Sequence, residues 1–182
     1  RALKMHGGVG RIVAGKPLDP ALEAEDAEAV RRGAANLAKQ IENVRAYGVP
    51  VVVAINSFPT DAASEVAAVR EASLAAGARD AVTATHFTDG GAGAEDLARA
   101  VWAAAQEGAP DFRFLYPDDA PLSEKIETIA TRIYGADGVD FGAGVIEQLE
   151  RIEGIGYGHL PICMAKTHLS LSHDPARKGR PS

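Results

Sequence analysis

The sequence is poor in the residues that build disulfides and metal sites. Cys163 is the only cysteine among 182 residues, which excludes an internal disulfide and a metal site made of several thiolates. No two histidines lie four residues apart within a predicted helix, so a helical zinc site lacks support. We therefore expect no metal bound by residues of this chain alone.

Long apolar runs and an excess of positive charge are also missing. No run approaches the ~20 apolar residues that span a bilayer, and no secretory leader is visible. The net charge is −6 and the isoelectric point is near 5.4. This balance argues against non-specific nucleic-acid binding, which needs a cationic surface. We expect a cytoplasmic protein that has neither a membrane nor a nucleic acid as partner.

Three common catalytic or phosphate-binding motifs are absent. No glycine-rich stretch ends in Gly-Lys-Ser/Thr, as a P-loop does, and no Gly-x-Gly-x-x-Gly follows a predicted strand. No Gly-x-Ser-x-Gly nucleophile elbow is present. The turn Gly90–Gly93 precedes a predicted helix, where backbone N–H groups can face an anion, but entry into the helix explains it equally well. The catalytic residues therefore stay unknown.

The most informative segment that is present spans Val49–Asp61. Its first part, Val49–Ile55, is a β-branched run typical of a buried parallel strand. A polar and aromatic cluster that includes Phe58 follows, and ligands bind at the carboxyl ends of strands in open α/β sheets. The cluster is a candidate site, although Asn56 can equally start a turn and Asp61 can cap the next helix.

Periodicity and end signals predict alternating helices and strands. Asp19 is placed as an N-cap with Pro20 at the first helical position, and Gly48 and Gly77 are placed to end helices. Helices are expected at residues 21–47, 61–76, 94–106, 123–134 and 144–155, and strands at 49–55, 80–84 and 160–165. Residues 112–116 are expected as a short strand or an extended segment, and residues 139–141 as a short extended segment. The alternation predicts an α/β fold with a mainly parallel sheet and helices on both faces, P-loop-NTPase-like or Rossmann-like.

The two ends of the sequence indicate that the chain is a fragment of a longer polypeptide. The chain starts at Arg1 without Met, and neither end has the composition of a disordered tail. Residues 1–8 read as the end of a strand that enters a glycine turn. Two side chains elsewhere are expected only to pack: Cys163 as an inert core thiol and Trp102 within a helix.

Four polar clusters are predicted to follow strands. They begin at Met5, Asn56, His86 and Lys166. Because the strand ends of one parallel sheet converge on one edge, we expect these clusters to line a shared pocket.

Several long motifs resemble those of the formate–tetrahydrofolate ligase family. They read Ala-Leu-Lys-Met-His-Gly-Gly, Asn-Leu-x-x-x-Ile-Glu-Asn, Gly-Val-Pro-Val-Val-Val-Ala-Ile-Asn-x-Phe-x-Thr-Asp, Ile-Tyr-Gly-Ala-Asp-Gly-Val and Leu-Pro-Ile-Cys-Met-Ala-Lys-Thr. They lie at residues 2–8, 36–43, 48–61, 133–139 and 160–167. The motifs are ungapped and keep the family's order, so the resemblance covers essentially the whole chain.

The resemblance implies a ligase that joins formate to tetrahydrofolate with ATP through formyl phosphate. ATP and Mg²⁺ would depend mainly on the family's P-loop, which lies outside this sequence, so the fragment alone should be inactive. Residues 1–20 would be the remnant of a preceding nucleotide-binding domain, and residues 21–182 an α/β folate-facing domain. The intact protein would be a homo-oligomer. The alternatives are a stand-alone folate- or nucleotide-binding module and a structural or interaction domain.

The resemblance also assigns candidate site residues. Two aromatic side chains sandwich the folate ring in the family, and they fall on Phe58 and on Phe87, where Trp is usual. Stacking between aromatic faces suits a flat heteroaromatic ring, and we favour this role over the alternative that both phenylalanines are partly buried loop anchors. Possible nucleotide or phosphate contacts are Lys4, His6, Gly7, Gly8, Asn56, Asp61, Lys166 and Thr167.

Overall fold

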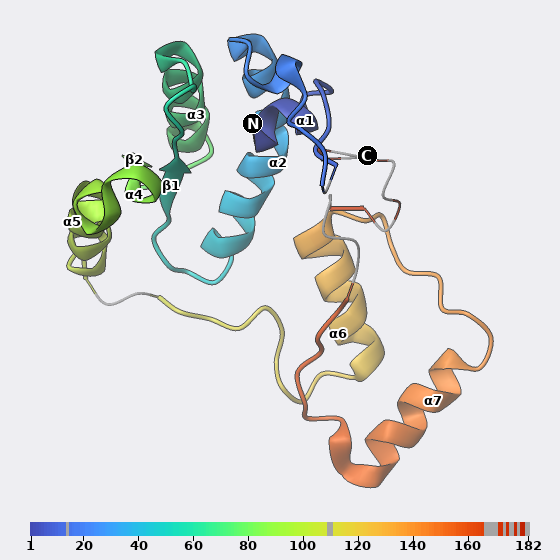
Figure 1. Cartoon of the computed structure of the whole chain (residues 1–182). Coiled ribbons are helices and arrows are strands. Elements are labelled where there is room, and N and C mark those ends of the chain that lie inside the picture. Colours follow the sequence, from blue (N-terminus) through green and yellow to red (C-terminus); the bar gives the residue numbers. More distant parts are fainter. Residues whose placement is uncertain are drawn as a thin grey trace.

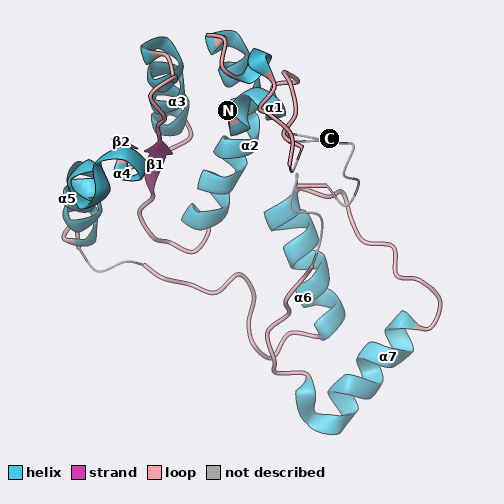
Figure 2. Ribbon diagram, in the orientation of Figure 1, coloured by secondary structure: helices cyan, strands magenta, loops and turns pink. Residues whose placement is uncertain are grey.

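The structure, a computed structural model, is mainly helical and contains a small parallel sheet (Figures 1 and 2). It describes residues 1–13, 15–108, 111–165, 171–172, 174, 177 and 179–180. In chain order the elements are α1 (Ala2–His6), η1 (Pro20–Leu22), α2 (Ala27–Arg45), β1 (Val52–Asn56), α3 (Ala63–Ala75), β2 (Asp80–Ala84), α4 (His86–Asp89), η2 (Gly90–Ala94), α5 (Glu95–Ala105), α6 (Leu122–Thr128), η3 (Ile129–Tyr134), α7 (Val145–Ile152) and η4 (Glu153–Tyr157). Among the described residues, no helix is both long and apolar enough to cross a membrane.

The sheet confirms the predicted α/β class. Strands β1 and β2 pair in parallel, from Val52 opposite Asp80 to Asn56 opposite Ala84, and α3 connects them as a βαβ unit. Helices α3 and α5 both contact the two strands. β1 is only half-buried, because in the described part of the chain it pairs with a strand along one edge only.

The long helix predicted at residues 21–47 is two elements. Asp19 caps η1 as expected, its Oδ1 accepting from Ala21 N at 3.0 Å. The chain then turns, and Asp26 caps α2 by accepting from Ala29 N at 2.8 Å. This second cap breaks the helix, since an Asp that bonds the backbone of the next turn competes with continued helix.

The prediction that residues 1–8 contain the end of a strand is wrong. Residues 2–6 form the helix α1, because alanine, leucine, lysine and methionine all favour helix. α1 packs directly on α2, where a Cβ on Gly33 would lie 1.8 Å from the carbonyl oxygen of Leu3. A glycine at this point therefore sets the close approach of the two helices. The proposed domain boundary at residue 20 stays a prediction.

Two loop predictions also change. Asp61 does not cap α3, whose N-cap is Ala62; Glu65 instead accepts from Ala62 N at 3.4 Å. Residues 86–91, expected as a loop ahead of the helix predicted to begin near Ala94, instead form the short helix α4 and the start of η2. The predicted ends at Gly48 and Gly77 hold, since both glycines have positive φ, +74° and +92°.

The C-terminal helices lie apart from the sheet (Figure 1). They connect to α2 through hydrogen bonds from Lys39 Nζ to Arg132 O at 2.6 Å and from Asn43 Nδ2 to Ile133 O at 3.0 Å. Residues 160–165 and 112–116 form no strand, because no described strand lies beside them to complete a ladder.

Two packing predictions are wrong. Cys163 is exposed, since its segment joins no sheet that would bury it. Trp102 is 70% exposed, because it lies on a face of α5 that nothing in the described chain covers.

Candidate functional site

The candidate site lies where β1 and β2 end. The register places Asn56 beside Ala84, and Ser57 N extends the pairing by donating to Ala84 O at 3.1 Å. The two strands are parallel, so the loops that follow them leave from the same edge of the sheet. The prediction that the Asn56 and His86 loops share one edge is confirmed.

Phe58 and Phe87 bring these two loops together. Their ring centroids lie 5.8 Å apart, with an angle of 54° between the ring planes. Phe58 is half-buried, whereas Phe87 is 74% exposed. A flat ring held between two aromatic faces needs about 7 Å from wall to wall, twice the ~3.5 Å carbon contact distance. The two rings therefore touch each other here, and Phe87 has the open space in which to move aside.

The Phe58 loop is fixed by contacts on two sides. Asp61 Oδ2 accepts from Phe58 N at 2.9 Å, and Asp61 N donates to Phe58 O at 2.9 Å. Arg1 places its guanidinium carbon 4.6 Å from the Phe58 ring centroid. Arg1 Nη2 also donates to Thr60 Oγ1 at 2.8 Å. Asp61 thus closes the loop from within, and Arg1 supports it from α1.

The Phe87 loop is closed by Thr85. Thr85 N donates to Gly93 O at 2.9 Å, and Thr85 Oγ1 donates to Asp89 Oδ2 at 2.6 Å. A Cβ on Gly93 would lie 2.6 Å from the Thr85 carbonyl carbon, so this position needs glycine. In this structure Gly93 serves the close approach of the two backbones, which accounts for part of the glycine turn at residues 90–93.

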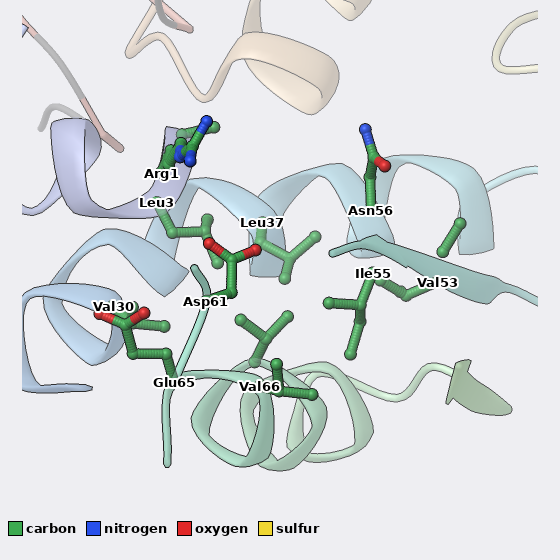
Figure 3. Close-up of a pocket in the computed structure, with 13 residues that line it drawn as sticks. Arg1, Leu3, Val30, Leu37, Val53, Ile55, Asn56, Asp61, Glu65 and Val66 are labelled. Atoms are coloured by element: carbon green, nitrogen blue, oxygen red, sulfur yellow. The ribbon is translucent and has the colours of Figure 1, made fainter. Parts of the chain in front are cut away.

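An open cavity of about 270 Å³ lies beside β1 and is bordered by α1, α2 and α3 (Figure 3). Its walls are mainly apolar, with Val53 and Ile55 from β1 and Val66 from α3. Polar groups come from Arg1, Asn56, Asp61 and Glu65. A cavity of this size holds one small ring system rather than a whole folate-sized molecule, since drug-sized ligands occupy roughly 300–1,000 Å³.

Lys4, a predicted phosphate contact, is buried at 1% exposure. Its Nζ donates to Leu22 O at 2.9 Å and Ala24 O at 2.7 Å, and it pairs with Glu65 Oε1 at 2.6 Å. An ammonium has three donors, and all three are used. The structure therefore places Lys4 in the packing between η1 and α3, where protein groups use all three of its donors.

The partner of Lys4 is held as a carboxylate. Burial alone would raise the pKa of Glu65, but the hydrogen bond from Lys4, together with those from the backbone of Asp26 and Ala62, lowers the pKa below its ordinary value. Asp26 N donates to Glu65 Oε1 at 2.8 Å. One buried ion pair thus ties together α1, the start of α2 and the start of α3.

The remaining candidates are dispersed. A Cβ on Gly7 would lie 2.1 Å from Ala29 O, so Gly7 serves the packing of α1 on α2. Gly8 has a φ of +88° and faces open space, and His6 Nδ1 accepts from Gly179 N at 3.2 Å. Lys166 and Thr167 lie outside the described residues, and so does the loop that they begin.

Arg1 was not among the residues predicted from the sequence, because no spacing in the sequence links it to Phe58.

Comparison with known proteins gives matches along the whole chain. The family profile described as formate–tetrahydrofolate ligase matches residues 1–182. A formate–tetrahydrofolate ligase from Desulforamulus reducens is 54% identical over 181 residues, covering 100% of this chain and 32% of its own length. One from Saccharopolyspora erythraea is 53% identical over 183 residues, with the same two coverages. The cytoplasmic C-1-tetrahydrofolate synthase of Schizosaccharomyces pombe is 50% identical over 182 residues, which is 19% of its length. The chain thus spans a third or less of these relatives.

Proposed function

This chain belongs to the formate–tetrahydrofolate ligase family, and on that premise we propose that it forms the folate-facing part of an ATP-dependent ligase. In the proposed reaction ATP phosphorylates formate to formyl phosphate. The amine nitrogen of tetrahydrofolate then attacks the formyl carbon, and phosphate leaves. The task of this chain is to place the folate ring beside the mixed anhydride, which is a contribution of proximity and orientation.

The observation that carries the proposal is the meeting of Phe58 and Phe87 at one edge of the sheet. They come from different loops, yet their rings are in contact at 5.8 Å between centroids. Aromatic pairs are worth about 0.5–1.5 kcal/mol beyond the area that they bury. A flat ring that enters between them exchanges one such contact for two, which favours a stacked ligand.

Phosphate handling is proposed to come from parts of the polypeptide outside this chain. The predicted contact Lys4 is fully used by protein partners. Within the described ranges there is also no group of three or more His, Cys, Asp or Glu residues that could hold a metal ion. We therefore assign no step through Mg²⁺ to the described residues, and we propose that ATP and Mg²⁺ are held mainly by the P-loop region of the family.

The proposal also includes the cellular compartment and the oligomeric state of the protein. The S. pombe relative carries the word cytoplasmic in its name, and we place this protein in the cytoplasm as well. We propose a homo-oligomer with small-molecule substrates.

The test is Phe58→Ala in the full-length protein. Loss of one stacking face should weaken tetrahydrofolate binding about tenfold, since ~1.4 kcal/mol is one decade. The affinity for ATP should change less than twofold. Equilibrium dissociation constants of both ligands measure the effect.

Phe114→Ala is the matched control. Phe114 is more exposed than Phe58, at 69%, and it contacts Phe112 through its ring instead of Phe87. We expect it to leave both affinities unchanged. Equal losses for ATP and tetrahydrofolate in Phe58→Ala, or no loss at all, would show that Phe58 is a loop anchor. Tight tetrahydrofolate binding with no turnover would favour a binding module over a ligase.

A further inference from the structure

We propose that Arg1 is the positioning residue of the folate site, acting on tetrahydrofolate through the ring of Phe58. This inference rests on the function proposed above. Arg1 holds Phe58 in the orientation that a stacked ligand needs.

The geometry joins Arg1 to the Phe58 loop at two points. The guanidinium carbon lies 4.6 Å from the ring centroid, well within the ~6 Å range of a cation–π contact. Nη2 donates to Thr60 Oγ1 at 2.8 Å, two residues further along the same loop. The Arg1 side chain is 22% exposed, so water screens these contacts less than it would on an open surface.

The helix that carries Arg1 is itself firmly placed. Arg1 directly precedes α1, which the buried pair of Lys4 and Glu65 ties to α3. The close packing at Gly33 ties α1 to α2 as well. Arg1 therefore contacts Phe58 from a firmly packed part of the fold. Little further conformational entropy of Arg1 is then lost when a ligand binds.

One consequence follows for the ligand. A phenyl ring has two faces, and the guanidinium over one face of Phe58 leaves the other face for stacking. Arg1 thus fixes both the tilt of Phe58 and the side from which a flat ring can approach. Lysine is a poor replacement, because a flat guanidinium can lie on a ring and donate to Thr60 at once, whereas an ammonium is a point charge.

The experiment is a double-mutant cycle in the full-length protein, read as dissociation constants for tetrahydrofolate and ATP. Arg1→Ala should weaken tetrahydrofolate binding about three- to tenfold and leave ATP within twofold. Arg1→Lys should fall between Arg1→Ala and the wild type. In a Phe58→Ala background, Arg1→Ala should cost less than twofold more, because its effect passes through the ring that has been removed.

Arg11→Ala is the matched control, since Arg11 is an exposed arginine on the segment after α1. We expect it to leave both affinities unchanged. If Arg1→Ala loses no folate affinity while Phe58→Ala does, the positioning role is overturned and the proposed function stands. Full additivity of the two losses would mean that Arg1 acts independently of the Phe58 ring, which also overturns the inference. If Phe58→Ala has no effect, both proposals fall together.

Discussion

Lys4 and Glu65 show how a charged side chain can serve the fold rather than the ligand. Both are buried, at 1% and 5% exposure, and each has its hydrogen-bonding groups used by protein partners. Removing one member of such a pair leaves the other charge buried and uncompensated, which is far more costly than losing a surface pair. The charge of Lys4 is therefore needed to keep α1 in place.

The substitution Lys4→Met should lower the local stability of α1 and the start of α3 by about 3–5 kcal/mol. Hydrogen exchange of the α1 and α3 amides in the full-length protein measures this locally. Lys16→Met is the control, because Lys16 is exposed and its replacement should cost less than about 0.5 kcal/mol. Unchanged protection of α1 in Lys4→Met would contradict the structural role.

At the level of the elements, the packing of α1 on α2 depends on small residues. Gly33 lies in the middle of α2, where alanine would favour the helix by about 1 kcal/mol. The structure reverses this preference, because the added Cβ would lie 1.8 Å from the Leu3 carbonyl oxygen. α1 would have to shift away, together with the Arg1 side chain that supports the candidate site.

Gly33→Ala should therefore lower the melting temperature of the full-length protein and weaken tetrahydrofolate binding. Gly154→Ala tests the same chemical change in η4, where a Cβ meets nothing within 4 Å. There the helix preference should act alone, so that stability stays equal or rises. A Gly33→Ala variant as stable as the wild type would show that the two helices can separate at little cost.

The sequence predicted some elements well and others poorly, for physical reasons. Strand 80–84 and the helix at 94–106 were predicted nearly to their ends, since β-branched Val82 and Thr83 favour a strand and the alanine-rich run of α5 favours a helix. Residues 160–165 look equally strand-like, but a strand needs a neighbour, and the described chain offers none beside them. The local sequence pattern does not show whether a second strand lies alongside to form the hydrogen bonds of a sheet.

The same limit applies to the site. The sequence alone predicted that the loops of Phe58 and Phe87 lie close together, because the carboxyl ends of parallel strands lie at the same edge of a sheet. Arg1 could not, because its contact with Phe58 depends on the packing of α1, a helix that the sequence reading took for a strand end.

For the molecule as a whole, the proposed reaction needs more than this chain holds. The sequence has no P-loop, so residues 1–182 alone offer no preorganised cradle for the phosphates of ATP. We expect the isolated chain to show no ATP-dependent formylation of tetrahydrofolate, whereas the full-length protein turns over. An assay of both against an enzyme-free blank checks this. Turnover by the isolated chain would contradict the account.

A structure of the full-length protein with tetrahydrofolate bound would test directly whether Phe58 and Phe87 hold the folate ring. We expect the folate ring between Phe58 and Phe87, each phenyl face about 3.5–4.0 Å from it, with Phe87 moved aside and Arg1 still over the far face of Phe58. A folate ring bound elsewhere, with the two phenyl rings still in contact near 5.8 Å, would contradict it.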